Sequence, residues 1–308
     1  MRALVPTGNP ETLTMLGKVD PPAQRRHESL VRVTHVALNR ADFLYLGDPS
    51  ATFRPGIDAA GVVANAAADG SGPSEGSRVV LHLPSGGGAA EYVAAAADRL
   101  AVIPDNVGSA SAAALPLGGL VAQRLLALAG PLEGRRILAT GVGGGVGQFL
   151  IQLAVAGGAE ITAVAAQGQP TDHMAALGAK IVLDIDAVED AAFDVALESV
   201  GGDLGSKTAH KLRPGGQFLW FGQASGSPIT LDFFRQVQGG ASLTLRHFVY
   251  SDGDGQRDAR DLNALLDLAS RGSLRVEIGR RESWTEADSL LKEMAAGRLR
   301  GKAVLSVD

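Results

Sequence analysis

The residues most able to do chemistry lie in a glycine-rich turn at residues 140–147, Thr-Gly-Val-Gly-Gly-Gly-Val-Gly. An apolar, strand-like run at residues 137–139 precedes the turn. Phe149, Leu150 and Leu153 follow it with the spacing of one face of a helix. Glycines let the chain turn tightly and let a phosphate approach main-chain N–H groups, and the next helix adds partial positive charge. Strand, glycine turn and helix together predict a dinucleotide-binding turn.

The motif departs from the strict G-x-G-x-x-G pattern, because Val142 stands where the first glycine is expected. A P-loop is excluded, since no Gly-Lys-Ser/Thr follows. From these residues alone, a purely structural turn and a loop for a methyl-donor cofactor stay open. A second formal motif, G-x-S-x-G at residues 72–76, follows a loop and precedes a strand-like run, so it lacks the context of a hydrolase nucleophile.

Composition excludes several classes of protein. The length of 308 residues predicts about two domains at ~150 residues each. The net charge of −5 shows no excess of basic residues for binding nucleic acid. The absence of cysteine excludes disulfides, thiolate zinc sites and a cysteine nucleophile. No run approaches the ~20 apolar residues that span a bilayer, and the N-terminus lacks a signal-peptide core. We therefore expect a cytoplasmic protein with neither a membrane nor a nucleic-acid partner.

The turn must be positioned by the elements around it, and these change character along the chain. Before residue 105 the apolar runs are short, partly alternating and separated by Pro, Gly and Asp, which indicates an all-β unit. From residue 135 strands alternate with helices, which predicts a parallel sheet. A doubly wound sheet binds ligands at the carboxyl ends of its strands. That rule nominates residues 140–147, 165–167, 198–201, 222–223 and 247–249.

Five short motifs lie in order along nearly the whole chain. They are NRAD at 39–42, PGIDAAG at 55–61, GGVG at 144–147, LRPGG at 212–216 and GKAVL at 301–305. Their order and spacing resemble the medium-chain dehydrogenase/reductase superfamily, in its zinc-independent quinone oxidoreductase branch. In that branch a residue other than glycine is usual at the position of Val142.

The resemblance implies an α/β protein of two domains. A GroES-like β-barrel domain would span residues 1–115 and 275–308, and a Rossmann domain with a doubly wound parallel sheet would span residues 116–274. It also implies hydride transfer from NADPH to a quinone or an α,β-unsaturated carbonyl, the small-molecule substrate. Homodimers are common in the family, often through the edges of the two cofactor sheets, and residues 242–250 would supply that edge here.

The resemblance also bears on zinc. Zinc alcohol dehydrogenases use a cysteine and a Gly-His-Glu motif, whereas the matching segment here is Gly56-Ile57-Asp58 and the chain has no cysteine. We therefore expect no metal. Without a Lewis acid a simple ketone is hard to polarise, but hydride addition to a conjugated acceptor leaves an enolate that solvent can protonate.

The expected site residues come from the strand-end rule and the resemblance together. For catalysis we expect Tyr45, whose phenol can donate a hydrogen bond to the acceptor oxygen, and Asn39 near the nicotinamide. Other interpretations stay open: a turn residue for Asn39, an ordinary half-buried aromatic for Tyr45, a surface role for His247 and a merely packed stem for Lys302. The expected cofactor-binding residues are Asn39, Gly144, Gly145, Val146, Gly147, Gln167, Val200, Gly201, Gly222, His247, Phe248, Val249 and Lys302.

Cofactor choice depends on the end of the second strand of the parallel sheet, which reads Ala-Ala-Gln-Gly-Gln at residues 165–169. The carboxylate that would hold an NAD ribose is missing, which favours NADPH over NADH. The basic residue expected to bind a 2′-phosphate is missing too, since Pro170 stands where relatives carry lysine. Gln167 is therefore the residue expected to contact the phosphate, with Thr171 and His173 near it. Val121 replaces a threonine that relatives usually carry.

Two alternative functions remain beside a metal-free NADPH-dependent reductase of quinones or enones. One is an enoyl-thioester or other alkene reductase of the same superfamily, which would need a longer acceptor channel. The other is a non-catalytic NAD(P)H-binding regulator, which the missing threonine and lysine keep open. Turnover of a conjugated acceptor separates the enzymes from the regulator.

Overall fold

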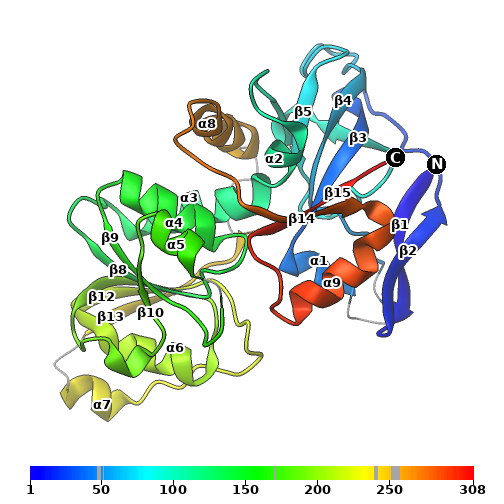
Figure 1. Cartoon of the computed structure of the whole chain (residues 1–308). Coiled ribbons are helices and arrows are strands. Elements are labelled where there is room, and N and C mark those ends of the chain that lie inside the picture. The colour runs from blue at the N-terminus through cyan, green and yellow to red at the C-terminus, as the bar shows by residue number, and fades with distance from the viewer. Residues whose placement is uncertain (47–49, 51, 170, 239–241, 251–256) are drawn as a thin grey trace. The chain divides into compact units, whose positions relative to one another are not determined.

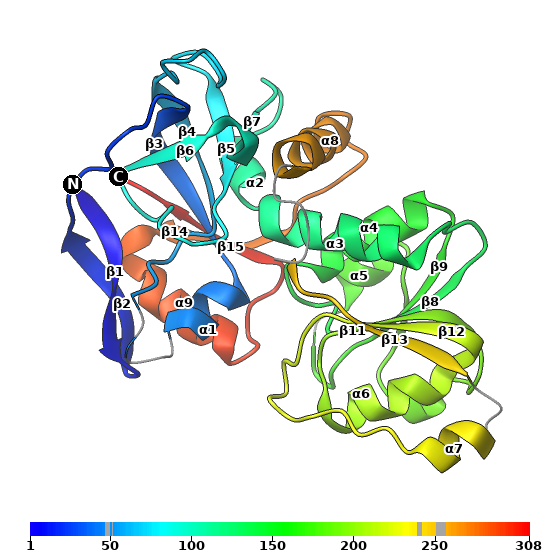
Figure 2. The same cartoon turned by 180° about the vertical axis from the view of Figure 1, so that it is seen from behind.

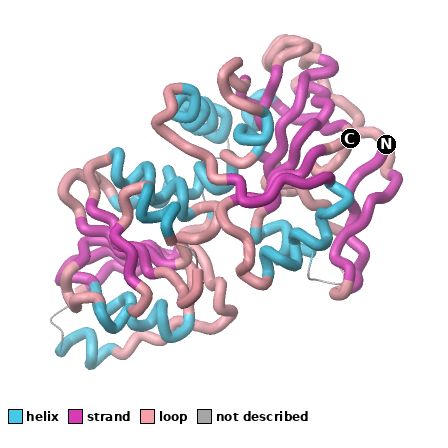
Figure 3. Tube along the Cα trace, in the orientation of Figure 1, coloured by secondary structure: helices cyan, strands magenta, loops and turns pink. Residues whose placement is uncertain are grey.

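The computed structural model describes residues 1–46, 50, 52–169, 171–238, 242–250 and 257–308. The chain divides into two compact units, Met1–Leu120 with Asp254–Asp308, and Val121–Gly253. Each unit contains its own β-sheet and its own helices (Figures 1 and 3). These are called the first and the second unit below.

The first unit is built on a seven-stranded sheet in the order β14-β15-β3-β4-β5-β7, with β6 paired to β3 (Figure 2). All its pairs are antiparallel except β14 with β15. A separate hairpin joins β1 (Arg2–Asn9) to β2 (Thr12–Lys18). The sheet strands are β3 (Glu28–Leu38), β4 (Asp58–Asn65), β5 (Arg78–His82), β6 (Tyr92–Ala96), β7 (Leu100–Val102), β14 (Ile278–Ser283) and β15 (Lys302–Ser306).

One face of this sheet carries the core of the first unit. Val36 and Leu38 of β3 and Leu305 of β15 are buried there with Leu290 and Leu291 of α9. The helix α9 (Ala287–Ala295) contacts β2 and α1 (Arg40–Leu46). The short helix α2 (Ser109–Ala113) contacts β3, β4 and β5. The C-terminal segment therefore completes the fold of the N-terminal one.

The second unit is a six-stranded sheet in the order β10-β9-β8-β11-β12-β13, and every pair is parallel. This is the strand order of a Rossmann fold, with its switch point between β8 and β11. Helices α3, α4 and α5 cover one face and α6 and α7 the other (Figures 1 and 2). The strands are β8 (Arg136–Thr140), β9 (Glu160–Val164), β10 (Lys180–Val182), β11 (Phe193–Glu198), β12 (Leu212–Trp220) and β13 (Leu243–His247). The helices are α3 (Pro116–Ala129), α4 (Gly147–Ala156), α5 (Asp172–Ala176), α6 (Gly202–Thr208) and α7 (Phe233–Gln238).

Strand β12 begins earlier than the predicted strand at residues 217–222. It starts at Leu212 and continues through Pro214, Gly215 and Gly216, where the register with β11 shifts. Gly215 has a φ of +79°, so the turn chemistry of this segment produces a bulge within the strand.

Helix α8 (Asp258–Ser270) packs within the first unit, whereas the predicted domain bounds place it with the Rossmann domain. Arg99, in the 3₁₀ helix η1 (Ala97–Arg99), lies 2.6 Å from the Asp258 carboxylate. Asn106 donates a hydrogen bond of 2.8 Å to the Ser270 carbonyl. Both ends of α8 are thus attached to the first unit. In the described part of the chain, no helix has the length and apolar character needed to cross a bilayer.

Candidate functional site

The glycine turn joins β8 to α4 at the carboxyl edge of the parallel sheet. Gly141 has a φ of +65°, and a Cβ there would lie 2.2 Å from Ser199 Oγ. A Cβ on Gly147 would lie 2.0 Å from the Val142 carbonyl oxygen, so only glycine lets α4 begin this close to the turn. A Cβ on Gly144 would meet nothing nearer than 3.8 Å, and no side chain caps α4. The backbone of the turn can therefore receive an anionic ligand.

A buried carboxylate fixes the neighbouring strand end. Glu198 Oε1 accepts hydrogen bonds from the backbone N–H groups of Val200 at 2.7 Å and Gly201 at 2.8 Å. The same oxygen accepts a bond of 3.1 Å from the Thr140 hydroxyl at the end of β8. Burial raises the pKa of Glu198, against the effect of these hydrogen bonds. The carboxylate ties the end of β11 to the end of β8, on both sides of the switch point.

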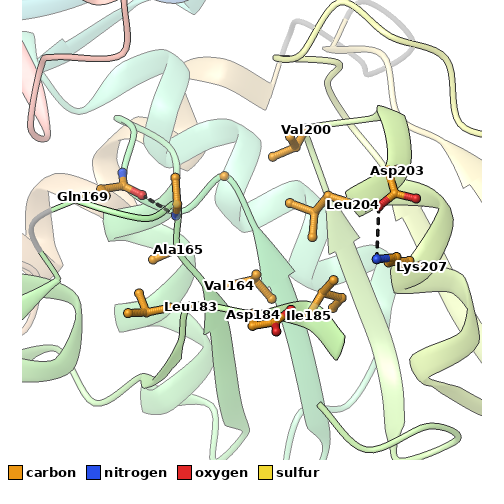
Figure 4. A pocket seen from close by; sticks show the side chains of 12 residues that line it. Val164, Ala165, Gln169, Leu183, Asp184, Ile185, Val200, Asp203, Leu204 and Lys207 are labelled. Carbon is orange, nitrogen blue, oxygen red and sulfur yellow. Dashed lines mark hydrogen bonds and ion pairs between the residues drawn. The ribbon is translucent and has the colours of Figure 1, made fainter. Parts of the chain in front are cut away.

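A pocket of about 360 Å³ opens at this edge (Figure 4). The Gln169 side chain lies at one side of it, and its Oε1 accepts a hydrogen bond of 3.2 Å from Ala166 N. A Cβ on Gly143 would lie 1.6 Å from Gln169 Nε2, so this side chain lies directly against the glycine turn. The pocket is lined by Gly141, Val164, Ala165, Ala166, Gln169, Leu183, Asp184, Ile185, Val200, Asp203, Leu204 and Lys207.

Acidic side chains outnumber basic ones in the lining of this pocket. Asp184 and Asp203 belong to the lining, and the Lys207 Nζ lies 3.2 Å from Asp203 (Figure 4). The same Nζ lies 2.7 Å from Asp186. Hydrogen bonds from the ammonium to Asp186 and Asp203 raise the pKa of Lys207. Lys207 is thus charged, and it is the one cation among the described residues that line the pocket.

The ends of β12 and β13 complete the edge. Trp220 and His247 are register partners, with ring centroids 5.0 Å apart. Phe248 N donates to the Trp220 carbonyl at 2.7 Å, and Trp220 Nε1 donates to the Gly222 carbonyl at 2.6 Å. Phe248 is half-buried, whereas His247 and Val249 are exposed. The four predicted residues on these strand ends thus lie together.

A separate cluster of polar side chains is buried in the first unit, around Asp58. The Asp58 carboxylate accepts hydrogen bonds from Asn39 Nδ2 at 2.9 Å, His82 Nδ1 at 3.0 Å and the backbone N–H of Leu117 at 3.0 Å. The Lys302 ammonium lies 3.4 Å from Asp58 Oδ2 and donates to Asn39 Oδ1 at 2.5 Å. Burial by itself would raise the Asp58 pKa, but Lys302, His82 and Asn39 hold it below its ordinary value.

Asp42 is a second buried carboxylate of the first unit. Its Oδ1 accepts a hydrogen bond of 2.8 Å from Gly56 N, and its Oδ2 accepts one of 2.8 Å from Asn39 N. It therefore ties the start of α1 to the segment before β4. Burial raises the pKa of Asp42 to about 6, although these backbone donors act in the opposite direction.

The Asp42 pKa predicts a stability change in mildly acidic solution. The folded-state pKa of Asp42 is about 6, above the ordinary 3.8. Between these two pH values Asp42 is therefore protonated in the folded chain and ionised in the unfolded chain. The contribution of Asp42 should therefore become less favourable as pH rises from about 4 to about 6, by on the order of 2 kcal/mol. Urea unfolding of wild type and Asp42→Asn at both ends of this window tests it. A difference between the two proteins that stays constant with pH would contradict the prediction.

Comparison with known proteins assigns the family. The model of the alcohol dehydrogenase GroES-like domain matches residues 25–105, and a zinc-binding dehydrogenase model matches residues 172–305. The Escherichia coli quinone oxidoreductase complexed with NADPH has the same fold, with a TM-score of 0.88 at 20% identity over 100% of both chains. The structure of the Coxiella burnetii quinone oxidoreductase matches with a TM-score of 0.86 at 24% identity, over 100% of this chain and 99% of that one. This chain is a quinone oxidoreductase-like member of the medium-chain dehydrogenase/reductase superfamily.

Curated relatives agree with the family at modest identity. The Pseudomonas aeruginosa quinone oxidoreductase is 27% identical over 314 residues, 97% of this chain and 96% of that protein. The 2-methylene-furan-3-one reductase of Solanum lycopersicum is 34% identical over 232 residues, 69% of this chain. The match spans 59% of that reductase. The predicted α/β fold, with a GroES-like and a Rossmann part, is confirmed.

Within this family the expected cofactor residues fall into two groups, one in each unit. Gly144, Gly145, Val146 and Gly147 form the turn, and Val200, Gly201, Gly222, His247, Phe248 and Val249 lie on the other strand ends of the second unit. Asn39 and Lys302 lie together in the first unit. Gln167 is exposed and does not line the pocket, whereas Gln169 does. Sequence alone could not separate these two glutamines, because both follow the same strand.

The first-unit residues differ in how they are held. The Asn39 amide is engaged on both sides, since Nδ2 bonds Asp58 and Oδ1 accepts from Lys302. Lys302 is buried with its charge, so its ammonium is not in solvent. Tyr45 on α1 is 51% exposed, and its ring lies 4.9 Å from that of Phe53. The structure brings Asn39 to Lys302, whereas among the described residues Tyr45 makes no hydrogen bond to that cluster.

The remaining expectations concern Val121, Pro170 and metals. Val121 is a buried apolar residue of α3. Pro170 lies outside the described residues. The cluster around Asn39 and Lys302 also contains Asp58 and His82, which were not among the expected site residues, although Asp58 stands in the segment compared with the zinc enzymes. Within the described residues, no three His, Cys, Asp or Glu side chains are placed to hold a metal ion.

Proposed function

We propose that this chain is an NADPH-dependent oxidoreductase that reduces quinones or α,β-unsaturated carbonyls without a metal. The observation that carries the proposal is the glycine turn, whose close-packed Gly147 and open Gly144 leave backbone donors at the N-terminus of α4. The family, together with the reductase and quinone oxidoreductase names of the Solanum lycopersicum and Pseudomonas aeruginosa relatives, supports this reaction class.

The chain's own residues would bind and orient, while the nicotinamide supplies the hydride when it is bound. The backbone of residues 144–147 would bind the pyrophosphate, and the pocket beside Gln169 would take the adenosine. Tyr45 would donate a hydrogen bond to the acceptor oxygen. Hydride addition to the β-carbon of an enone leaves an enolate, which water protonates. A quinone correspondingly becomes a hydroquinone after taking up a proton.

The reaction class is tested by initial rates of NADPH and NADH oxidation with a simple quinone and with a simple enone, in the presence of a chelator. We expect turnover with NADPH preferred. Turnover of a thioester-conjugated alkene, and not of quinones, would favour the alkene reductase instead. Cofactor binding without turnover of any conjugated acceptor would replace the enzyme by a non-catalytic regulator.

Lys207 is the residue that we expect to select NADPH. Its ammonium is the cation at the pocket that could neutralise a 2′-phosphate, although Asp186 and Asp203 share it. We expect Lys207→Gln to weaken NADPH binding about 10-fold, or ~1.4 kcal/mol, and to leave NADH binding unchanged. Titration of both cofactors measures it. Lys180→Gln is the control, because Lys180 is an exposed residue of β10 that does not line the pocket. Equal losses for both cofactors would contradict this assignment.

A homodimer through β13 is a further part of the proposal. β13 is the last strand of the sheet, and it carries the exposed Leu245. Val249, which follows this strand, is exposed as well. An exposed strand edge with apolar side chains pairs readily with a second copy of itself. We expect Leu245→Lys to be monomeric by light scattering, and Val155→Lys on α4 to behave as wild type. A wild-type monomer would contradict it. The cytoplasmic location and a purely small-molecule substrate stay predictions.

A further inference from the structure

The first unit has a second pocket that the proposed reaction does not use. It measures about 320 Å³ and is lined by His35, Ala110, Arg281, Glu282, Ser283, Val304 and Ser306. All of these residues belong to the first unit, and none lines the pocket beside the glycine turn. The two pockets are therefore distinct sites.

The register of three strands explains how the second pocket is built. Ser283 of β14, Ser306 of β15 and His35 of β3 are successive partners across the sheet. Arg281 and Val304 are also register partners, two residues before Ser283 and Ser306 on their strands. Because side chains alternate along a strand, these four side chains lie on the same face of the sheet. The short helix α2 covers β3 to β5 and supplies Ala110 as a wall.

Arg281, Ser283 and Ser306 bring hydrogen-bond donors to this pocket, and Glu282 is the acidic residue in its lining. Arg281 makes no ion pair among the described residues, whereas Arg280 beside it lies 3.3 Å from Glu282 and 3.5 Å from Glu293. The hydroxyls of Ser283 and Ser306 donate over 3.4 Å, to Asp308 and to the Glu282 carbonyl. Bonds this long are weak, so both hydroxyls can turn to a ligand at little cost.

His35 is a further polar group of this pocket, and its ring can donate a hydrogen bond to a ligand when it is protonated. The Thr34 hydroxyl donates to the Ala60 carbonyl at 3.2 Å, so its oxygen accepts from His35 Nδ1–H, 3.1 Å away. Nε2 then carries the lone pair of the neutral ring, so it becomes a donor to an anion only after it takes up a proton. Burial, together with the charge of Arg281, lowers the pKa of His35, and an anion between the two groups would remove that repulsion. The other charged groups nearby are Glu282, which pairs with Arg280, the Asp308 carboxylate, and the mutually paired Asp58 and Lys302.

We propose that this pocket binds a small organic oxyanion, a carboxylate or a phosphate monoester, through Arg281, His35, Ser283 and Ser306. A guanidinium and hydroxyls suit the oxygens of such a group. Val304 and Ala110 give the pocket an apolar side for the remainder of the ligand. A volume near 320 Å³ is at the lower end of the range for small-molecule sites, so it holds more than a bare ion.

The test uses the His35 ring as a local reporter in the full chain. Phenyl phosphate, benzoate and inorganic phosphate are titrated while the ring resonances of the histidines are recorded by NMR. The His35 signal is assigned by its loss in His35→Gln. We expect a saturable shift of the His35 signal and a rise of its pKa with phenyl phosphate or benzoate, at a Kd of about 1 mM or below. Tighter binding of phenyl phosphate would identify the natural ligand as a phosphate monoester, and tighter binding of benzoate would identify it as a carboxylate.

The matched variants are Arg281→Gln and Arg280→Gln, neighbours on β14 that face opposite sides of the sheet. Arg281→Gln should weaken the ligand at least about 10-fold, while Arg280→Gln should bind it like wild type. Neither variant should change NADPH oxidation, so this result is independent of the proposed reductase activity. No saturable shift of His35 with any probe, or equal binding by wild type and Arg281→Gln, would overturn the proposal.

Discussion

Replacing Lys302 with methionine should lower the free energy of unfolding by about 3–5 kcal/mol, because it leaves the Asp58 carboxylate buried without its cation. Lys302 is 2% exposed and Asp58 is fully buried. Three further donors remain on Asp58, from Asn39, His82 and the Leu117 backbone, but none of them replaces the ammonium. Urea denaturation at neutral pH measures the loss.

The control for this prediction is Lys292→Met. Lys292 lies 2.8 Å from Asp288 one helical turn away, but its side chain is 43% exposed, so its loss should stay within about 0.5 kcal/mol. The double variant Asp58→Asn/Lys302→Met removes both charges and should recover at least about 1 kcal/mol relative to the sum of the single losses. Equal stability of the Lys302 and Lys292 variants would show that the buried ion pair does not support the fold.

A valine at Gly144 should weaken NADPH binding at least about 10-fold while leaving the stability of the chain within about 0.5 kcal/mol of wild type. The nearest atom to a Cβ at this position is 3.8 Å away, so the protein can accept the side chain. The same side chain would stand on the turn where the pyrophosphate approaches the backbone. Titration of NADPH, together with thermal unfolding, separates these two effects.

Gly108→Val is the matched control, because a Cβ at Gly108 also meets no atom within 4 Å and this residue only precedes α2. It should bind NADPH like wild type. Gly147 is unsuitable as a probe, since a Cβ there would lie 2.0 Å from the Val142 carbonyl oxygen and would disturb the fold itself. Wild-type affinity in the Gly144 variant would remove the glycine turn from the cofactor site and with it the main support of the proposed function.

The parallel sheet of the second unit was predictable because its signals are local. Each strand is a short apolar run, and the turn after β8 has glycines where φ is positive or where two backbones come close, at Gly141 and Gly147. Strand–helix alternation then leaves few topologies open, and the observed order follows from right-handed crossovers. The bulge at residues 214–216 was missed because proline and glycine ordinarily end a strand.

The sequence by itself determined the two-part α/β fold, the dinucleotide turn and the strand ends on which further cofactor residues are expected, because periodicity and glycine spacing act over a few residues. Only the tertiary structure decided which distant side chains meet. Asn39 and Lys302 are 263 positions apart, and β15 brings them together by pairing with β3. The contact of Gln169 with the glycine turn, the partners of Asp58 and the row from Ser283 to His35 likewise depend on how distant segments are placed, which no local pattern specifies.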